Sequence, residues 1–406
     1  MAYITGQTEQ GCCLPVKYSG NNTYECEPDV GELHKKHKIY NDYHMFYAKI
    51  VGQKGERVNI NIKWPQYDPA LVSEEYQKWA SYSADWPSFF PTVKETLYLS
   101  EDEINWGNIV NAEQEGDTIK VSFVMTSNVM YISSTLHYTP ANYRNLIDTV
   151  ETTDKIQVLS LGKAYDGSEF LTFVATDFSV PATDKKTVYI QAAQHCHEHT
   201  GCHICDYMLR FLASGKADDI LKKYIFRITP VVDVFGWKLG KQTNPNRCDS
   251  LGFNYNRDWK DFTLPEVKAI DEYIKKCMAD GEKFCFVADM HGGTGNEDDY
   301  KSGASVTMDK NASDEVIEKQ KIFVDMVREK CDFLNPEDEG YIICDDGDNL
   351  FEHYAQVNYG PTFTFEISMS KIWDREAKRR FPNSQASYKR FAEQLTRVIP
   401  EWIEKE

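Results

Sequence analysis

The chain has 406 residues, of which 41% are hydrophobic and 13% aromatic, a content sufficient for two folded domains. Its formal charge of −18 repels nucleic acid and anionic lipid, and no basic patch interrupts that charge, so we expect neither nucleic acid nor a membrane as a partner. The eleven cysteines form no paired framework, and neither a secretory leader nor an apolar run of about 18 residues occurs, which predicts a cytoplasmic protein.

Residues 1–137 have the pattern of a β-domain. Runs rich in β-branched and aromatic residues, such as YHMFYAKIVG, RVNINIKW, IKVSFVM and NVMYISSTL, alternate with turn-rich or acidic stretches. Such a series is typical of an antiparallel β-sandwich. The hydrophobic pattern changes near Tyr138. We place there the boundary between an accessory domain, residues 1–137, and a second domain, residues 138–406.

In residues 138–406, apolar strands alternate with amphipathic helices. The segment TPANYRNLIDTVE predicts a helix with Thr139 as its N-cap and Pro140 at its first position. Further along, TVYIQAAQ, FCFVADMHG and TFTFEIS predict strands, while PEVKAIDEYIKKCMA and SYKRFAEQLTRVIPEWIEK predict helices. The alternation predicts an α/β domain with a mixed central sheet flanked by helices, in which ligands gather at the carboxyl ends of strands.

Polar residues that suit a metal site follow three of the predicted strands. His195 and Glu198 stand three apart in QAAQHCHEHTG, His291 ends FCFVADMH, and Glu366 lies near the end of TFTFEIS. Two histidines and a carboxylate, with a fourth position left for water, make a catalytic zinc set. A carboxylate among apolar residues suits a base beside such a metal. His197 stays open as an alternative ligand to His195.

The polar stretch NPNRCDSLGFNYNRDW, residues 244–259, suggests a carboxylate-binding loop. It carries Arg247 and Arg257, each preceded by an asparagine. A guanidinium group binds a carboxylate through two parallel hydrogen bonds, and an asparagine adds a neutral donor. The pair Asn256 and Arg257 would therefore hold the free α-carboxylate of a substrate if the loop lies beside the metal. An ordinary solvated loop with surface ion pairs is the alternative.

Taken together, these motifs resemble the zinc metallocarboxypeptidase family, of the carboxypeptidase A-like type. The upstream sandwich makes the chain look most like the cytosolic carboxypeptidase branch. The resemblance implies a carboxypeptidase-like α/β fold and one Zn²⁺ ion held by His195, Glu198 and His291. It also implies that Glu366, at the position of the family's strand-end glutamate, is the catalytic base.

The resemblance extends to the substrate loop. NYNRDW is similar to the family's D/N-x-N-R-N/D-W stretch, which implies that Asn256 and Arg257 bind the terminal carboxylate. RCDSLG resembles the RCSLSG stretch of cytosolic carboxypeptidases, which implies that Arg247 stabilises the oxyanion. Without gaps, the residue that tunes the side-chain pocket falls near Phe351, suggesting an apolar or aromatic preference.

The match weakens in YIICDDGDNLFEHYAQVNYG. The flexible tyrosine of the pancreatic enzymes, 22 residues before the catalytic glutamate, aligns with Cys344, so a gap would be needed for Tyr341 or Tyr354 to replace it. Acidic residues in the same stretch leave a preference for basic side chains open; they are Asp345, Asp346 and Asp348.

We therefore predict a cytoplasmic zinc metallocarboxypeptidase, a hydrolase and protease that removes residues from peptide or protein C-termini. Metal-activated water would attack the peptide bond, with a glutamate as general base. One alternative is a zinc amidase or deacylase acting on a non-peptide or cell-wall-type amide that bears a free carboxylate. Another is a catalytically dead module that binds peptides. The oligomeric state and the role of the sandwich are not predicted.

Overall fold

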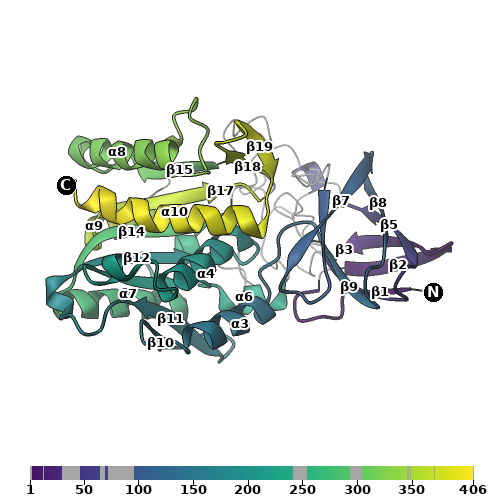
Figure 1. Ribbon diagram of the computed structural model, residues 1–406, viewed down its shortest axis with the longest axis horizontal. Coiled ribbons are helices and arrows are strands. Elements are labelled where there is room, and N and C mark those ends of the chain that lie inside the picture. The colour runs from purple at the N-terminus through teal and green to yellow at the C-terminus, as the bar shows by residue number, and fades with distance from the viewer. Residues whose placement is uncertain are drawn as a thin grey trace. The chain divides into compact units, whose positions relative to one another are not determined.

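The structure, a computed structural model, describes residues 2–11, 13–29, 46–64, 69–71, 96–240, 254–292, 304–344, 347, 349–369 and 371–405. The chain divides into two compact units, which are shown in Figure 1. The first contains Met1–Asn142 and Phe235–Asn254, and the second contains Tyr143–Val234 and Tyr255–Glu406. The predicted contiguous division after residue 137 stays a prediction.

The first unit is built from β-strands. Within the described residues, nine strands are hydrogen-bonded in the order β1-β4-β9-β6-β7-β8-β5-β3-β2. Their bounds are β1 (Tyr3–Thr5), β2 (Cys13–Gly20), β3 (Thr23–Pro28), β4 (Tyr47–Val51), β5 (Arg57–Lys63), β6 (Thr96–Ser100), β7 (Trp106–Glu115), β8 (Thr118–Val124) and β9 (Val129–Ser133). β7 pairs with β6 through its first residues and with β8 through its last. It therefore joins the strands β1, β4, β9 and β6 to the strands β8, β5, β3 and β2.

The alternating sequence pattern of this unit corresponds to one buried face. In β8, for example, Ile119, Val121 and Phe123 are buried while the residues between them are exposed. The predicted N-terminal antiparallel β-sandwich is confirmed, with one addition that the pattern did not predict: β3 and β5 pair in parallel.

The second unit is built on a mixed sheet. Its eight strands within the described residues follow the order β10-β11-β13-β12-β14-β17-β15-β16. Their bounds are β10 (Ile156–Lys163), β11 (Glu169–Ala175), β12 (Lys186–Ala192), β13 (Tyr224–Thr229), β14 (Lys283–His291), β15 (Ala304–Asp309), β16 (Tyr341–Cys344) and β17 (Thr362–Ile367). The central strands β13, β12, β14 and β17 are parallel, whereas β11 and β15 run antiparallel to their central neighbours. The predicted mixed sheet is confirmed.

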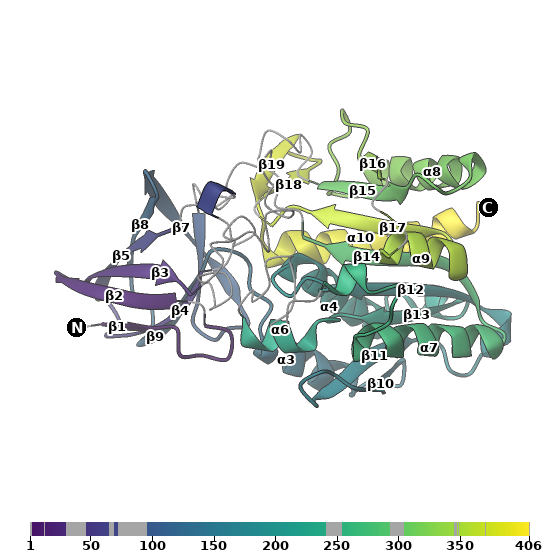
Figure 2. The ribbon, with the colours of Figure 1, turned by 180° about the vertical axis from the view of Figure 1, so that it is seen from behind.

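Helices cover both faces of this sheet. The apolar face packs against α3 (Pro140–Val150), α4 (His199–Ala213), α5 (Asp218–Leu221), α8 (Asp314–Lys330) and α10 (Gln385–Ile403). Figure 2 shows α7 (Pro265–Ala279) and α9 (Phe351–Asn358) in front of the opposite face. Two contacts place them there: Tyr273 of α7 bonds to Arg227 of β13, and His353 of α9 pairs with Asp309 of β15 at 2.8 Å.

The remaining elements are short. They are α6 (Val234–Leu239), a small hairpin of β18 (Lys371–Asp374) with β19 (Arg379–Pro382), and 3₁₀ turns at Pro69–Leu71, Ala182–Asp184 and Tyr255–Arg257. The predicted N-cap of α3 is confirmed, because the backbone N–H of Asn142 donates to Thr139 Oγ1 at 3.2 Å. Among the helices that the structure describes, none is both long and apolar enough to span a membrane.

Gly201 lets α4 approach the sheet closely, next to the end of β14. A Cβ atom on Gly201 would lie 2.3 Å from the carbonyl oxygen of Met290 and 2.9 Å from Ala192 Cβ. We expect Gly201→Ala to lower the free energy of unfolding by about 1–3 kcal/mol through overpacking. Urea unfolding measures the change. Gly107→Ala is the control, since nothing lies within 4 Å of its Cβ position. Equal stability of the two variants would contradict the expectation.

Candidate metal centre and substrate loop

The candidate metal centre forms where two neighbouring parallel strands end. Because β12 and β14 pair in parallel, their carboxyl ends lie at the same edge of the sheet. The chain leaves β12 through Ala193, whose φ of 55° is left-handed and therefore strained for a residue with a side chain. A tight turn follows, in which the N–H of Glu198 donates to the carbonyl of His195 at 3.0 Å. This turn presents both side chains beside His291, the last residue of β14.

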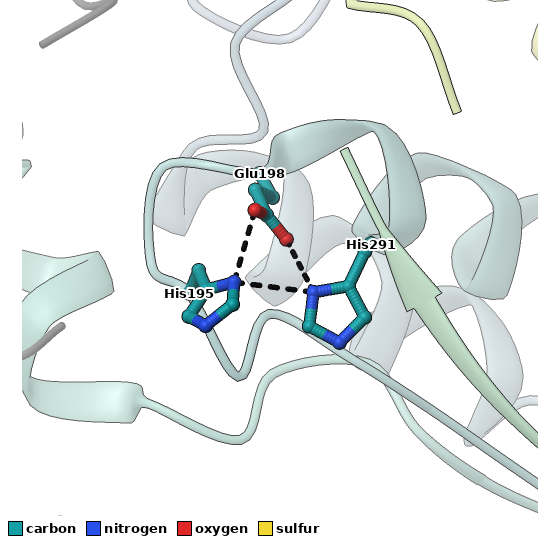
Figure 3. Close-up of side chains that lie close together, drawn as sticks. All are labelled: His195, Glu198 and His291. Carbon is teal, nitrogen blue, oxygen red and sulfur yellow. Dashed lines mark hydrogen bonds and ion pairs between the residues drawn. The ribbon is translucent and has the colours of Figure 1, made fainter. Parts of the chain in front are cut away.

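Figure 3 shows the three side chains turned toward one another. Nδ1 of His195 lies 3.0 Å from Glu198 Oε1, and Nδ1 of His291 lies 2.8 Å from Glu198 Oε2. The two Nδ1 atoms are 3.1 Å apart. The three residues each offer a ligand atom, these atoms lie within 4.8 Å of one another, and each residue is at most 3% exposed. Two imidazole nitrogens and a carboxylate are the donor set of a catalytic zinc ion, so these residues fit zinc.

The neighbouring charges control the protonation of Glu198 and His291. Burial acts to raise the pKa of Glu198, but the adjacent His195 and His291 outweigh burial and hold that pKa well below its ordinary value. Burial acts to lower the pKa of His291, but the carboxylates of Asp289 and Glu198 raise it well above its usual value. The site therefore carries a carboxylate charge that a bound cation can neutralise.

His291 has a second carboxylate partner, Asp289. Nε2 of His291 lies 2.6 Å from Asp289 Oδ2. The two residues are two apart on β14, so their side chains lie on the same face of the sheet. The sequence predicted no role for Asp289, which lies in FCFVADMHG. The i,i+2 spacing on a strand was the available signal.

Glu366 lies next to His291 in the sheet. β17 is parallel to β14, and Glu366 is the register partner of His291. Phe363 and Phe365 point into the apolar core, so the alternating Thr364 and Glu366 lie on the opposite face. Neighbouring strands are about 4.8 Å apart, so the half-buried side chain of Glu366 lies on the strand next to His291, at the edge of the sheet where the candidate metal centre forms.

The predicted substrate residues Asn256, Arg257 and Phe351 are brought together at the start of α9. Asn256 Oδ1 accepts a hydrogen bond from the backbone N–H of Phe351 at 3.0 Å, and Asn349 Nδ2 donates to the carbonyl of Arg257 at 3.2 Å. The Phe351 ring is fully buried and packs on Trp259, with ring centroids 4.6 Å apart. Arg247 lies outside the described residues, as do the acidic residues of the weak stretch, Asp345, Asp346 and Asp348.

The alternative residues His197 and Tyr354, and the nearby histidines of α4, lie outside the group of converging donors. Among the described residues, the group that could hold a metal contains His195 and not His197. His199 and His203 belong to α4, and burial together with nearby His203 and His197 lowers the pKa of His199 to about 3. The hydroxyl of Tyr354 donates to Asp271 at 2.8 Å and accepts from Lys275 at 2.9 Å, which ties it to α7.

Comparison with known proteins finds a matching family model and solved structures with the same fold. Residues 143–296 match the model of the zinc carboxypeptidase family. A metallo-carboxypeptidase from Burkholderia cenocepacia has the same fold at 16% identity, with all of both chains covered and a TM-score of 0.75. A metallo-carboxypeptidase from Pseudomonas aeruginosa, solved with (2-guanidinoethylmercapto)succinic acid, is 12% identical, with 99% of both chains covered and a TM-score of 0.72. No curated protein sequence matches the chain significantly.

The family match spans the segment that contains His195, Glu198 and His291. The solved structures share the fold of both units along the whole length. The chain therefore carries a segment, residues 143–296, that matches the zinc carboxypeptidase family, and this segment contains the three residues that could hold a metal ion.

Proposed function

We propose that the protein removes the C-terminal residue of peptides or proteins, with His195, Glu198 and His291 as its zinc ligands. The observation that carries this proposal is the convergence of two Nδ1 atoms and a carboxylate, beside a strand whose Glu366 is in register with His291. Zinc in such a site polarises the scissile carbonyl and makes water acidic enough to lose a proton near neutral pH.

Glu366 is the proposed general base. Its carboxylate takes the proton from the attacking water and returns it to the amine that leaves. Its half-buried position next to His291 supports this role, because the carboxylate keeps access to the site while part of its solvation is removed. Arg247 remains the predicted donor to the oxyanion, a contact worth about 2.7–4 kcal/mol in comparable sites.

Asn256 and Arg257 are the proposed anchors for the terminal carboxylate. The backbone N–H of Phe351 can only donate, so the atom of Asn256 that receives it is the amide oxygen. The amide nitrogen, which is the donor that a carboxylate needs, therefore points away from Phe351. This contact supports a part for Phe351 in positioning Asn256 through its backbone, whereas its buried ring packs on Trp259.

The chemistry of the substrate follows from these groups. A free carboxylate is required for binding, so the proposed activity is that of an exopeptidase. The ligand of the Pseudomonas neighbour carries two carboxylates and a guanidinium group, and it is a suitable probe for a preference for basic residues in this protein. A cytoplasmic location also remains part of the proposal and rests on the spacing of the cysteines in the sequence, which forms no paired framework.

The test is incubation of the zinc-loaded protein with peptides that differ only in their C-terminal residue, each as the free acid and as the C-terminal amide. Mass spectrometry should show stepwise loss of residues from the free acids, little loss from the amides, and none after chelation of zinc. Equal cleavage of acids and amides would contradict carboxylate recognition. Cleavage of N-acyl amino acids but of no peptide would favour the amidase, and binding without turnover in the presence of zinc would favour the binding module.

A further inference from the structure

We propose that Trp259, Gln194 and Asp289 form a positioning network that orients His291 and couples the loop of Asn256 and Arg257 to the zinc site. The inference rests on the proposed function of these residues and concerns the part that three buried side chains take in it. All three are fully buried in the same unit.

The first step of the network is the contact between Asp289 and His291. A carboxylate only accepts hydrogen bonds, so the 2.6 Å contact with His291 Nε2 places the imidazole proton on Nε2. Nδ1 faces Glu198 at 2.8 Å and His195 Nδ1 at 3.1 Å, so it is the nitrogen that would give up its proton to bind a metal while Nε2 keeps its own. Asp289 would thus keep the proton of a neutral His291 on Nε2, which leaves Nδ1 as the nitrogen that can bind a metal.

The second step joins the two segments that carry metal ligands. The same Asp289 oxygen accepts a hydrogen bond from Gln194 Nε2. Gln194 directly precedes His195, so Asp289 ties the turn after β12 to the end of β14. Because a buried amide without partners costs free energy, both ends of Gln194 must be satisfied.

The third step reaches the substrate loop. Trp259 Nε1 donates to Gln194 Oε1 at 2.7 Å. An indole nitrogen can only donate, so this bond fixes which end of Gln194 faces Asp289. Trp259 follows Arg257 by two positions, and its own backbone N–H donates to Asn349 at 3.2 Å. A shift of the loop on binding a carboxylate would therefore change the hydrogen bonds that hold His291.

A coupling of this kind is distinguishable from simple core packing. By linkage, if a terminal carboxylate strengthens zinc binding, zinc strengthens carboxylate binding by the same factor. Trp259→Phe keeps an aromatic ring against Phe351 but removes the N–H, which leaves Gln194 Oε1 without its donor. Trp402→Phe is the matched control, since Trp402 is equally buried in the same unit and donates Nε1–H to the carbonyl of Lys319 at 3.1 Å.

The experiment measures zinc affinity by chelator competition, with and without N-acetyl-phenylalanine as a carboxylate probe. Loss of an outer partner of a metal ligand typically costs about 10–100-fold in metal affinity. We expect Trp259→Phe and Gln194→Met to weaken zinc binding about tenfold and to reduce the effect of the probe, while Trp402→Phe leaves both unchanged. The visible spectrum of the Co²⁺-substituted protein should shift in the first two variants only, which reports on ligand orientation.

The outcomes separate this inference from the proposed function. Wild-type protein that binds zinc and cleaves peptides, with variants of unchanged zinc affinity and Co²⁺ spectrum, would overturn the network alone. Wild-type protein that binds no zinc would overturn the proposed function and the network with it. Equal losses in Trp259→Phe and Trp402→Phe would show a general effect of indole removal and would also overturn the network.

Discussion

Glu198→Gln should weaken zinc binding by more than about a hundredfold and abolish peptide cleavage. Loss of an outer partner already costs about 10–100-fold in metal affinity, so loss of a ligand costs more. The substitution keeps the size of the side chain but removes the charge that lies between the Nδ1 atoms of His195 and His291. Chelator competition measures the affinity.

The same variant should lose the stabilisation that zinc provides. A ligand that binds only the folded state at a hundred times its dissociation constant adds about 2.7 kcal/mol to the free energy of unfolding. Denaturant unfolding with and without zinc should show this difference in the wild type and not in Glu198→Gln. A variant that is stabilised by zinc as strongly as the wild type would contradict the assignment of Glu198.

The two histidines of the turn provide a matched control. His195 and His197 are both buried, and their ring centroids are 6.4 Å apart. We expect His195→Gln to lose zinc as Glu198→Gln does, and His197→Gln to retain it, because the group of converging donors contains His195. The opposite result would move the ligand assignment by two residues.

Local signals in the sequence were sufficient to predict many of the helices and strands. They also predicted where the strands that carry the candidate site end. Apolar runs such as TVYIQAAQ and FCFVADMHG correspond to β12 and β14, because strands buried on both faces read as continuous hydrophobic segments. The polar residues that follow such runs lie at the carboxyl edge of a parallel sheet. For that reason His195, Glu198 and His291 could be proposed from the sequence as neighbours.

Contacts between segments that are distant in the sequence could not be predicted in the same way. The register that places Glu366 beside His291 depends on the order of strands in the sheet, which a local pattern does not contain. Trp259 is fully buried, as a packing residue would be. Its hydrogen bond to Gln194 joins residues 65 positions apart, and no spacing rule connects them.

Glu366→Gln should lower kcat by about 10²–10⁴-fold while zinc affinity stays unchanged. That range is the usual contribution of a general base, and the amide has the size of the carboxylate but cannot take a proton at neutral pH. The effect should fall on kcat and kcat/KM alike, because the lost interaction is made in the transition state. Steady-state kinetics on the best peptide substrate, together with chelator competition, separates this outcome from loss of the metal.

The control for Glu366→Gln is Glu266→Gln in α7. Glu266 is fully buried, and burial raises its pKa, so a neutral amide is a mild substitution there. One of its carboxylate oxygens accepts from the backbone N–H of Tyr165 at 2.9 Å, which an amide oxygen can replace. Glu266→Gln should retain activity. Near-full activity of zinc-loaded Glu366→Gln would assign the general base to another group. The pairing of Glu366 with His291 would then be a feature of the sheet with no part in the reaction.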